Sequence, residues 1–284
     1  MNPHYEWSLL QAIRLRQSTR RYSDRHVGDD QLQYLLEFAS RVRHIHTPGI
    51  RVDLVDGQEQ AARVLARYAG VYGLVQGAPH LLIGLLPEDT DEARLDLGFV
   101  LEQVVVEATR LGLATCWMTG SYHPGLAARE IELQEGEIVA AAVSLGYPRS
   151  DQRARLHDGL IRRIVRATRK RPLEEICFEG RWGHGWKPEE ADPLLVELLE
   201  YARLAPSAHN GQPWRFLVNR DRISLTLISA QPIDAGITMA HVELAAGELD
   251  VAGYWEPRLG DPSLGRDLGL PLSVIPVGVF HLRN

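Results

Sequence analysis

The main feature of the sequence is a pattern of hydrophobic and polar positions that occurs twice. In residues 29–55, apolar side chains recur at the i, i+3, i+4 and i+7 positions that form one face of a helix. Residues 192–218 show the same pattern 163 positions later, with nine of 27 residues identical and no gap. Both stretches predict an amphipathic helix, a loop and a short strand ending in Leu-Val. The apolar positions are Leu32, Leu35, Leu36 and Ala39 in the first stretch and Leu195, Leu198, Leu199 and Ala202 in the second.

The start of each predicted helix carries a capping residue. Asp29 and Asp192 stand where an N-cap is expected, because an aspartate oxygen can accept a free amide at the helix start. Pro193 then fits the first helical turn. These signals predict that the two helices begin at equivalent positions.

A second match occurs at a shift of 138 positions. Residues 96–117 and 234–255 share seven of 22 residues in register: Asp, Gly, Val, Ala, Leu, Ala and Trp. Residues 99–113 are apolar on nearly every side, which predicts a buried helix. Since the two shifts differ by 25 positions, the second repeat lacks about that many residues between its strand and its central helix.

The matches favour an internal duplication over chance similarity of two amphipathic helices, because they occur in the same order. Alternating helices and strands predict an α+β or α/β sheet with central helices. Of the two, we expect the α+β fold, with the central helices packed on mixed β-sheets. We expect two interlocked repeats, residues 1–165 and the shortened 181–284, joined by a basic tail over residues 166–180.

Composition restricts the function classes. The net charge of −6, from 31 basic and 37 acidic residues, argues against a nonspecific nucleic-acid binder, which is usually basic. No apolar run is long enough for a spanning helix, and the N-terminal residues lack a signal-peptide pattern. Two cysteines are too few for a disulfide framework. We therefore expect a cytoplasmic protein with no membrane partner.

Three segments carry candidate chemistry, and each has a simpler alternative. APSAHNGQPWRF (205–216) predicts a turn, whose Ser207, Asn210 and Gln212 could hydrogen-bond a flat ligand, while Trp214 could be a core residue. RQSTRRY (16–22) would place two guanidiniums and a hydroxyl on one side of an extended segment, a phosphate site, although a solvated strand also fits. The basic run RRIVRATRKRPLEE (162–175) predicts a bound phosphate or a solvated linker.

Other sites are not supported. The sequence contains no Gly-x-Gly-x-x-Gly for a Rossmann dinucleotide site and no Gly-x-Ser-x-Gly for a serine hydrolase. His44 and His46 lack further ligands at a recognisable spacing, so we expect no metal site.

Together these segments resemble the nitroreductase family of flavoproteins over nearly the whole chain. RQSTRRY resembles the family's Arg-x-Ser-x-Arg motif, and APSAHNGQPW its Pro-Ser-x-x-Asn-x-Gln-Pro-Trp loop. GLATCWMTG (112–120) is similar to a glycine-bounded segment beside the flavin, and LGYP followed by RKRPLEE to the phosphate-binding tail. Family members are usually homodimers with FMN at the interface.

The resemblance assigns cofactor-binding roles to particular residues. The phosphate end of FMN would bind the N-terminal motif and the tail, while the loop would line the ring and the glycine-bounded segment would present an amide to it. No side chain need act as a general base. The residues are Arg16, Ser18, Arg20, Thr119, Gly120, Arg169, Arg171, Pro206, Ser207 and Asn210.

The family pattern is divided between the two repeats. The first repeat has RVRHIHTPGI in place of the loop motif, and the second has Glu179, Arg181 and Gly183 opposite the N-terminal motif. We therefore expect a fused pseudo-dimer with one FMN per chain, a monomer rather than a homodimer.

The resemblance implies an FMN-dependent oxidoreductase. It would carry electrons from NAD(P)H to a small-molecule acceptor, such as a nitroaromatic, a quinone or a related electrophile, by a ping-pong mechanism. The alternative is a non-enzymatic protein that binds or sequesters flavin on the same fold.

Overall fold

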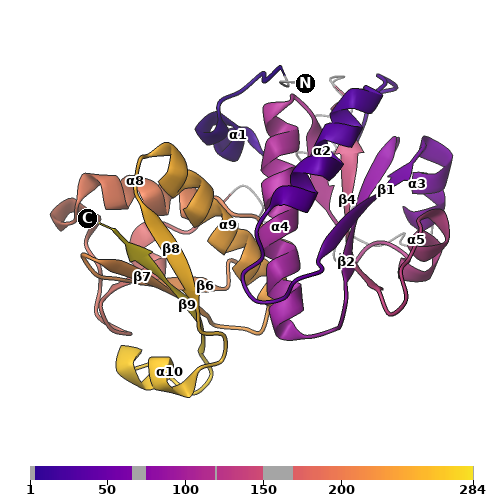
Figure 1. Cartoon of the computed structure of the whole chain (residues 1–284). Coiled ribbons are helices and arrows are strands. Elements are labelled where there is room, and N and C mark those ends of the chain that lie inside the picture. The colour runs from indigo at the N-terminus through magenta and orange to yellow at the C-terminus, as the bar shows by residue number, and fades with distance from the viewer. Residues whose placement is uncertain (1–3, 66–74, 119, 150–168, 284) are drawn as a thin grey trace.

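The two sheets of the protein lie on opposite sides of a pair of long central helices (Figure 1). The structure, a computed structural model, describes residues 4–65, 75–118, 120–149 and 169–283. The central helices are α4 (Asp91–Arg110) and α9 (Pro232–Glu248), which make the most extensive contact between any two elements. Helices and strands are combined as the sequence predicted, which confirms the α+β class.

The first half contains a four-stranded antiparallel sheet of order β1-β2-β4-β3. Helix α2 lies beside α4, while α3 and α5 contact each other on the other side of this sheet (Figure 1). Besides α4, the first half contains α1 (Leu9–Leu15), α2 (Asp29–Arg41), β1 (Arg51–Asp56), α3 (Gln58–Leu65), β2 (His80–Leu86), β3 (Ala114–Trp117), α5 (Pro124–Glu130) and β4 (Ile138–Gly146).

The second half contains a five-stranded mixed sheet of order β5-β6-β7-β9-β8. Strand β5 pairs with β6 in parallel, and the other pairs are antiparallel. Besides α9, the second half contains α7 (Leu173–Ile176), β5 (Cys177–Glu179), η1 (Pro188–Glu190), α8 (Pro193–Ala202), η2 (Ala208–Asn210), β6 (Trp214–Val218), β7 (Arg222–Leu227), β8 (Gly253–Pro257), α10 (Pro262–Leu268) and β9 (Ile275–Leu282).

The two sheets have the same strand order once β5 is set aside. β1, β2, β4 and β3 correspond to β6, β7, β9 and β8, and each sheet packs near its own central helix. Helix α3 follows β1, whereas β6 leads to β7 through only Asn219–Asp221. The absence of a helix between β6 and β7 accounts for much of the 25-position difference between the two sequence shifts.

The predicted connecting tail, residues 166–180, is described from Arg169 onward. These residues run beside the second half and end in β5, which extends its sheet. The chain thus crosses from the first half into the sheet of the second.

One of the two predicted caps differs from the structure. Asp192 caps α8 as expected, accepting the Leu194 amide at 2.9 Å, with Pro193 in the first turn. Helix α2, however, begins at Asp29 itself and is preceded by Gly28, which has no side chain to cap it. The cap prediction for Asp29 was therefore wrong by one position.

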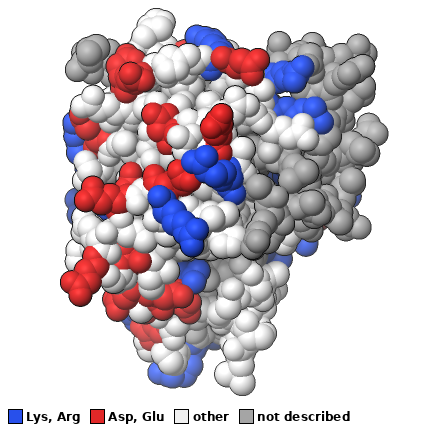
Figure 2. All heavy atoms as spheres, turned by 90° about the vertical axis from the view of Figure 1, so that its right-hand side faces the viewer, with Lys and Arg blue, Asp and Glu red and all other residues white. Residues whose placement is uncertain are grey.

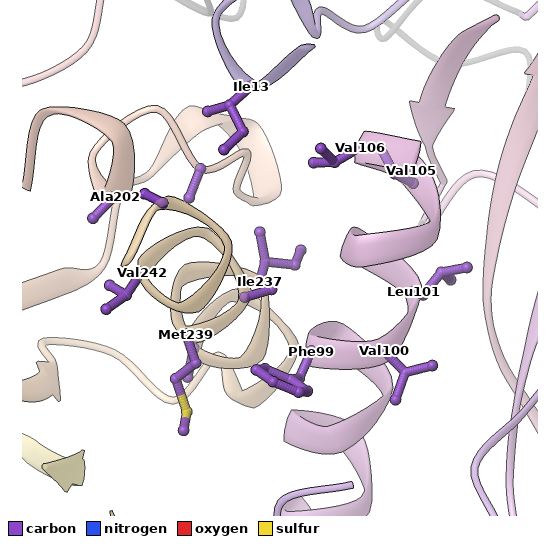
Figure 3. Packing of buried hydrophobic residues seen from close by; sticks show 14 of the residues in the cluster. Ile13, Phe99, Val100, Leu101, Val105, Val106, Ala202, Ile237, Met239 and Val242 are labelled. Carbon is purple, nitrogen blue, oxygen red and sulfur yellow. The ribbon is translucent and has the colours of Figure 1, made fainter. Parts of the chain in front are cut away.

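Burial of the central helices follows from their sequence. Helix α4 is buried along almost its whole length, as predicted for residues 99–113. Figure 3 shows Phe99 of α4 and Ile237 of α9 between the two helices. Leu101 and Met239 point away from that contact, each toward its own half (Figure 3). Apolar residues all around both helices are therefore needed, because each helix packs on its partner and on a sheet.

The surface carries charges of both signs. On the face in Figure 2, acidic and basic side chains are interspersed, so this face presents no continuous basic stripe among the described residues. None of the described helices combines the length and the apolar character needed to cross a bilayer.

Candidate functional site

The loop between α8 and β6, residues 205–212, has an unusual backbone. His209, Asn210 and Gln212 have positive φ angles of 52°, 54° and 48°, although none is glycine. The turn closes on Ser207, whose hydroxyl accepts the Gln212 amide at 3.0 Å and whose carbonyl accepts the Asn210 amide at 3.0 Å. Left-handed residues of this kind cost free energy and concentrate at functional sites. Pro206 and Ser207 lie half-buried at the start of this loop.

The basic tail lies directly against this loop. The Arg169 carbonyl accepts the side-chain amides of Asn210 and Gln212, each at 3.2 Å. The Arg171 amide donates to the Gln212 side-chain oxygen at 2.8 Å. Three predicted site residues, Arg169, Arg171 and Asn210, are therefore brought together by the tail and the loop.

Within the tail, it is Lys170 that points inward. Its ammonium donates to the Ala205 carbonyl and lies 5.7 Å from the centre of the Trp214 ring. Burial, with the nearby Arg16 guanidinium, lowers the pKa of Lys170 to about 7. The side chains of Arg169 and Arg171 are exposed, and Arg171 pairs with Glu175 at 3.0 Å.

Sequence reasoning missed Lys170. The signal was present, because alternate side chains of an extended segment point to opposite sides. If Lys170 points inward, its two neighbours point outward.

The N-terminal motif carries two buried arginines with unused donors. Arg16 follows α1, and its side chain is 8% exposed, while Arg20 is 9% exposed. Nε and Nη1 of Arg16 and Nη1 of Arg20 have no hydrogen-bond partner among the described residues. The nearest carboxylate oxygen paired with Arg16 belongs to Glu102, at 3.9 Å from Nε. Since burying a donor without an acceptor is costly, these donors fit a bound anion such as a phosphate.

Ser18 connects this motif to the end of β3. It forms a parallel bridge with Thr115, and the Thr19 amide donates to the Thr115 carbonyl at 2.9 Å. Thr119 lies outside the described residues, whereas Gly120 is exposed, and a methyl group added there would meet no atom within 4 Å. The space beside Gly120 therefore allows close approach of a ligand to the backbone.

A fully buried polar cluster lies below the arginine and was not predicted. Glu102 of α4 accepts the indole N–H of Trp117 at 2.7 Å and is 2.9 Å from Nε2 of His241 on α9. Nδ1 of His241 donates to the Tyr201 carbonyl at 3.1 Å, because a carbonyl can only accept. These contacts offset the cost of burying Glu102 and join the two halves beneath Arg16.

The Trp214 ring is a core residue, as the simpler interpretation had it. It is fully buried, and its indole N–H has no partner among the described residues. The ring lies beneath Lys170 and forms part of the floor under the tail.

Two buried aspartates occupy equivalent positions in the two halves. Asp234 of α9 accepts the Ala208 amide, with both carboxylate oxygens 3.2 Å from it. Burial raises the pKa of Asp234 to about 7, against the opposing effects of the Ala208 amide and Lys170. Asp96 of α4 accepts the amides of Ile45, His46 and Thr47 at 3.1, 2.8 and 2.7 Å.

These three amides of the first-half loop are therefore already hydrogen-bonded to Asp96 of α4. The His46 ring of this loop lies 3.3 Å from Asp96, so this histidine contributes to the same contact. Across the described ranges, no group of three or more His, Cys, Asp or Glu residues is placed to hold a metal ion.

Comparisons with known proteins bear on the family and the fold of the chain. A family model described as "Putative TM nitroreductase" matches residues 8–246. The crystal structure of a "putative nitroreductase" from Thermotoga maritima has a TM-score of 0.65 at 20% identity, covering 100% of this chain and 98% of that one. A search of curated proteins found no match.

Two further solved structures are nitroreductases with bound FMN. The Bacteroides fragilis structure has 21% identity and a TM-score of 0.43, over 50% of this chain and 89% of its own. The Desulfitobacterium hafniense structure has 22% identity and the same TM-score of 0.43, over 51% and 90%. Because the family model spans most of the 284 residues, the chain belongs to this nitroreductase family and has its fold.

Proposed function

We propose that the protein is an FMN-dependent oxidoreductase with one cofactor site per chain, built from both halves. The observation that carries the proposal is the pair of buried arginines, Arg16 and Arg20, each of which has at least one donor nitrogen with no hydrogen-bond partner among the described residues. A phosphate would satisfy these donors, because guanidinium groups bind its oxygens by charge-assisted hydrogen bonds. The proposal agrees with the FMN bound in the two nitroreductases compared above.

Each part of the proposed site has a distinct task. Arg16, Ser18, Arg20 and the tail with Arg169 and Arg171 would hold the phosphate end. The inward direction of Lys170 supports adding its ammonium to this set. Pro206, Ser207 and Asn210 would line the ring, and Thr119 with Gly120 would present a backbone amide to it.

The site positions a cofactor rather than a catalytic side chain. FMN, when bound, supplies the redox chemistry, with electrons taken from NAD(P)H and passed in a ping-pong cycle to a nitroaromatic, a quinone or a related electrophile. The chain's own residues would bind the phosphate, orient the ring and exclude water from its inner face. No general base is required among them.

We also propose that the single chain replaces the homodimer of its relatives. The shared strand order and the paired aspartates Asp96 and Asp234 support an origin by duplication. In the first half, amides of the loop already donate to Asp96, which supports the loss of the second cofactor site. Asp234 takes only the Ala208 amide from the loop that keeps the family motif.

The experiment uses the colour of the cofactor. The full chain, purified and incubated with FMN, is expected to be yellow, to bleach with NAD(P)H under anaerobic conditions and to regain colour with a nitroaromatic or a quinone. A yellow protein that does not bleach would favour the non-enzymatic flavin binder. A protein that takes up no FMN would overturn both functions.

An arginine variant tests the phosphate assignment. Arg20→Ala removes a charge-assisted contact, so FMN affinity should fall by the equivalent of about 1.5–3 kcal/mol. Arg129→Ala is the matched control, because Arg129 is an exposed residue on α5 away from the site. Fluorescence titration of FMN measures both, and equal affinities for the two variants would contradict the assignment.

A further inference from the structure

The backbone of loop 205–212 requires contacts that hold it in place. His209, Asn210 and Gln212 all have positive φ angles, a conformation that costs free energy for residues other than glycine. Such a loop keeps its shape only where surrounding groups determine it. Three side chains from outside or from the end of the loop supply these contacts.

Asp234 holds the start of the loop from the central helix α9. Its carboxylate is 4% exposed and accepts the Ala208 amide directly after Ser207. A carboxylate buried to this extent needs donors and nearby positive charge. Its donor here is the loop, and Lys170 provides the charge.

Lys170 holds the same region from the tail. Its ammonium donates to the Ala205 carbonyl, two residues before Ser207, and interacts electrostatically with Asp234. The tail connects the two halves of the chain, whereas the loop and α9 belong to the second half. The loop is thus fixed between α9 and the tail.

Gln212 holds the end of the loop. Its side-chain amide donates to the Arg169 carbonyl and its oxygen accepts the Arg171 amide, so it contacts both sides of Lys170. Gln212 is 4% exposed. Its side chain, the Arg169 carbonyl and the Arg171 amide therefore depend on one another for hydrogen bonding. The Gln212 side chain thus joins the loop to the tail by hydrogen bonds to backbone groups, as a neighbouring β-strand would.

We infer that Asp234, Lys170 and Gln212 act as positioning residues that lock loop 205–212 onto the tail in the conformation that binds FMN. The inference rests on the proposed function and extends it, since it makes assembly of the site depend on docking of the tail against the loop. The three residues act through the loop rather than by contact with the cofactor.

The first half supplies a matched control. Asp96 occupies the position 138 residues before Asp234 and also accepts the amide of the residue equivalent to Ala208, which is Ile45. It is fully buried and binds three loop amides rather than one. Its loop, however, lacks the family motif. Loss of Asp96 should therefore affect stability but not the cofactor.

The test compares Asp234→Ala with Asp96→Ala in the full-length protein. FMN affinity, measured by fluorescence titration, should fall about tenfold in Asp234→Ala, the effect of losing one hydrogen bond to a charged group. Asp96→Ala should keep FMN affinity within about twofold of the wild type. It should lower the Tm at least as much as Asp234→Ala does. Equal losses of affinity in both variants would overturn the inference, because they would indicate a general structural effect.

Conservative variants keep the test valid if an alanine variant fails to fold. Asp234→Asn retains an acceptor for the Ala208 amide and should recover most of the affinity. Gln212→Glu retains the acceptor for Arg171 but cannot donate to Arg169, so it should bind FMN more weakly than wild type. Wild-type affinity in Gln212→Glu would contradict the role of Gln212. Failure of the wild type to bind FMN would instead overturn the proposed function.

Discussion

Asp234 and Lys170 are buried groups of opposite charge whose pKa values both lie near 7. Burial acts on them in opposite directions, raising the pKa of the carboxyl and lowering that of the ammonium. Asp234 is 4% exposed, and the ammonium of Lys170 donates to the Ala205 carbonyl in the loop. Protonation changes at this pair therefore affect folding stability.

The pH dependence of stability can be predicted for Asp234. Its pKa rises from 3.8 in the unfolded chain to about 7 in the folded one, so the folded state binds more protons between these values. The contribution of this group to stability is fully present below about pH 4 and is lost as pH rises toward 7. Replacing Asp234 by Asn removes the titration, so the stability of the variant relative to wild type should increase over that range.

Urea unfolding of both proteins at several pH values between about 4 and 7 measures this difference. Groups that titrate equally in the two proteins cancel in the comparison. Stability curves that remain parallel over the range would contradict the assignment.

At the residue scale, sequence patterns named part of the proposed site. The motif residues Arg16, Ser18 and Arg20 could be named because their spacing is local. Lys170, Glu102 and His241 could not, since their partners are far away in sequence: Lys170 contacts Ala205, and Glu102 contacts His241. Gln212 was named as a possible ligand contact, but its side chain is used to hold the tail.

At the scale of elements, the contact between α4 and α9 depends on two glycines. Gly98 and Gly236 are related by the same shift of 138 as the two aspartates. A methyl group on Gly98 would overlap the Ile233 carbonyl oxygen, and one on Gly236 would overlap the Leu95 carbonyl oxygen. The helices therefore approach at a distance that only glycine permits at these positions.

Alanine substitution tests this close approach. Gly236→Ala should destabilise the protein by roughly 1–3 kcal/mol, because the backbone of α4 would have to move. Gly247→Ala on the same helix is the control, since a methyl group there meets no atom within 4 Å and alanine favours the helix by up to about 1 kcal/mol. Thermal unfolding compares the two, and a Gly236→Ala variant as stable as wild type would refute the close packing.

Elements were predicted where their signals are local. The helices with repeated leucines and the buried helix over 99–113 form as expected, because hydrophobic periodicity decides burial. The start of α2 was misplaced because Gly28 and Asp29 both allow a helix start. Strand β5 carries no periodic signal in its three residues and depends on its pairing with β6.

For the whole molecule, the proposal predicts stoichiometry and assembly. One chain should bind one FMN, because only the second-half loop keeps its motif and only the first half keeps the Arg-x-Ser-x-Arg motif. Flavin absorbance against protein concentration measures the ratio, and two FMN per chain would contradict it. Sedimentation should show a monomer, since α4 and α9 already bury each other within one chain.

The amino-acid sequence by itself determined the repeated helix–loop–strand pattern, the buried central helices and the location of the family motifs. These properties depend on neighbours within a few residues or on periodicity, which a single chain displays directly. Only the tertiary structure decided that β5 joins the sheet of the second half, that Lys170 rather than its neighbours points inward, and that Asp96 and Asp234 hold equivalent loops. Their contacts join distant residues, and burial makes each depend on its partner.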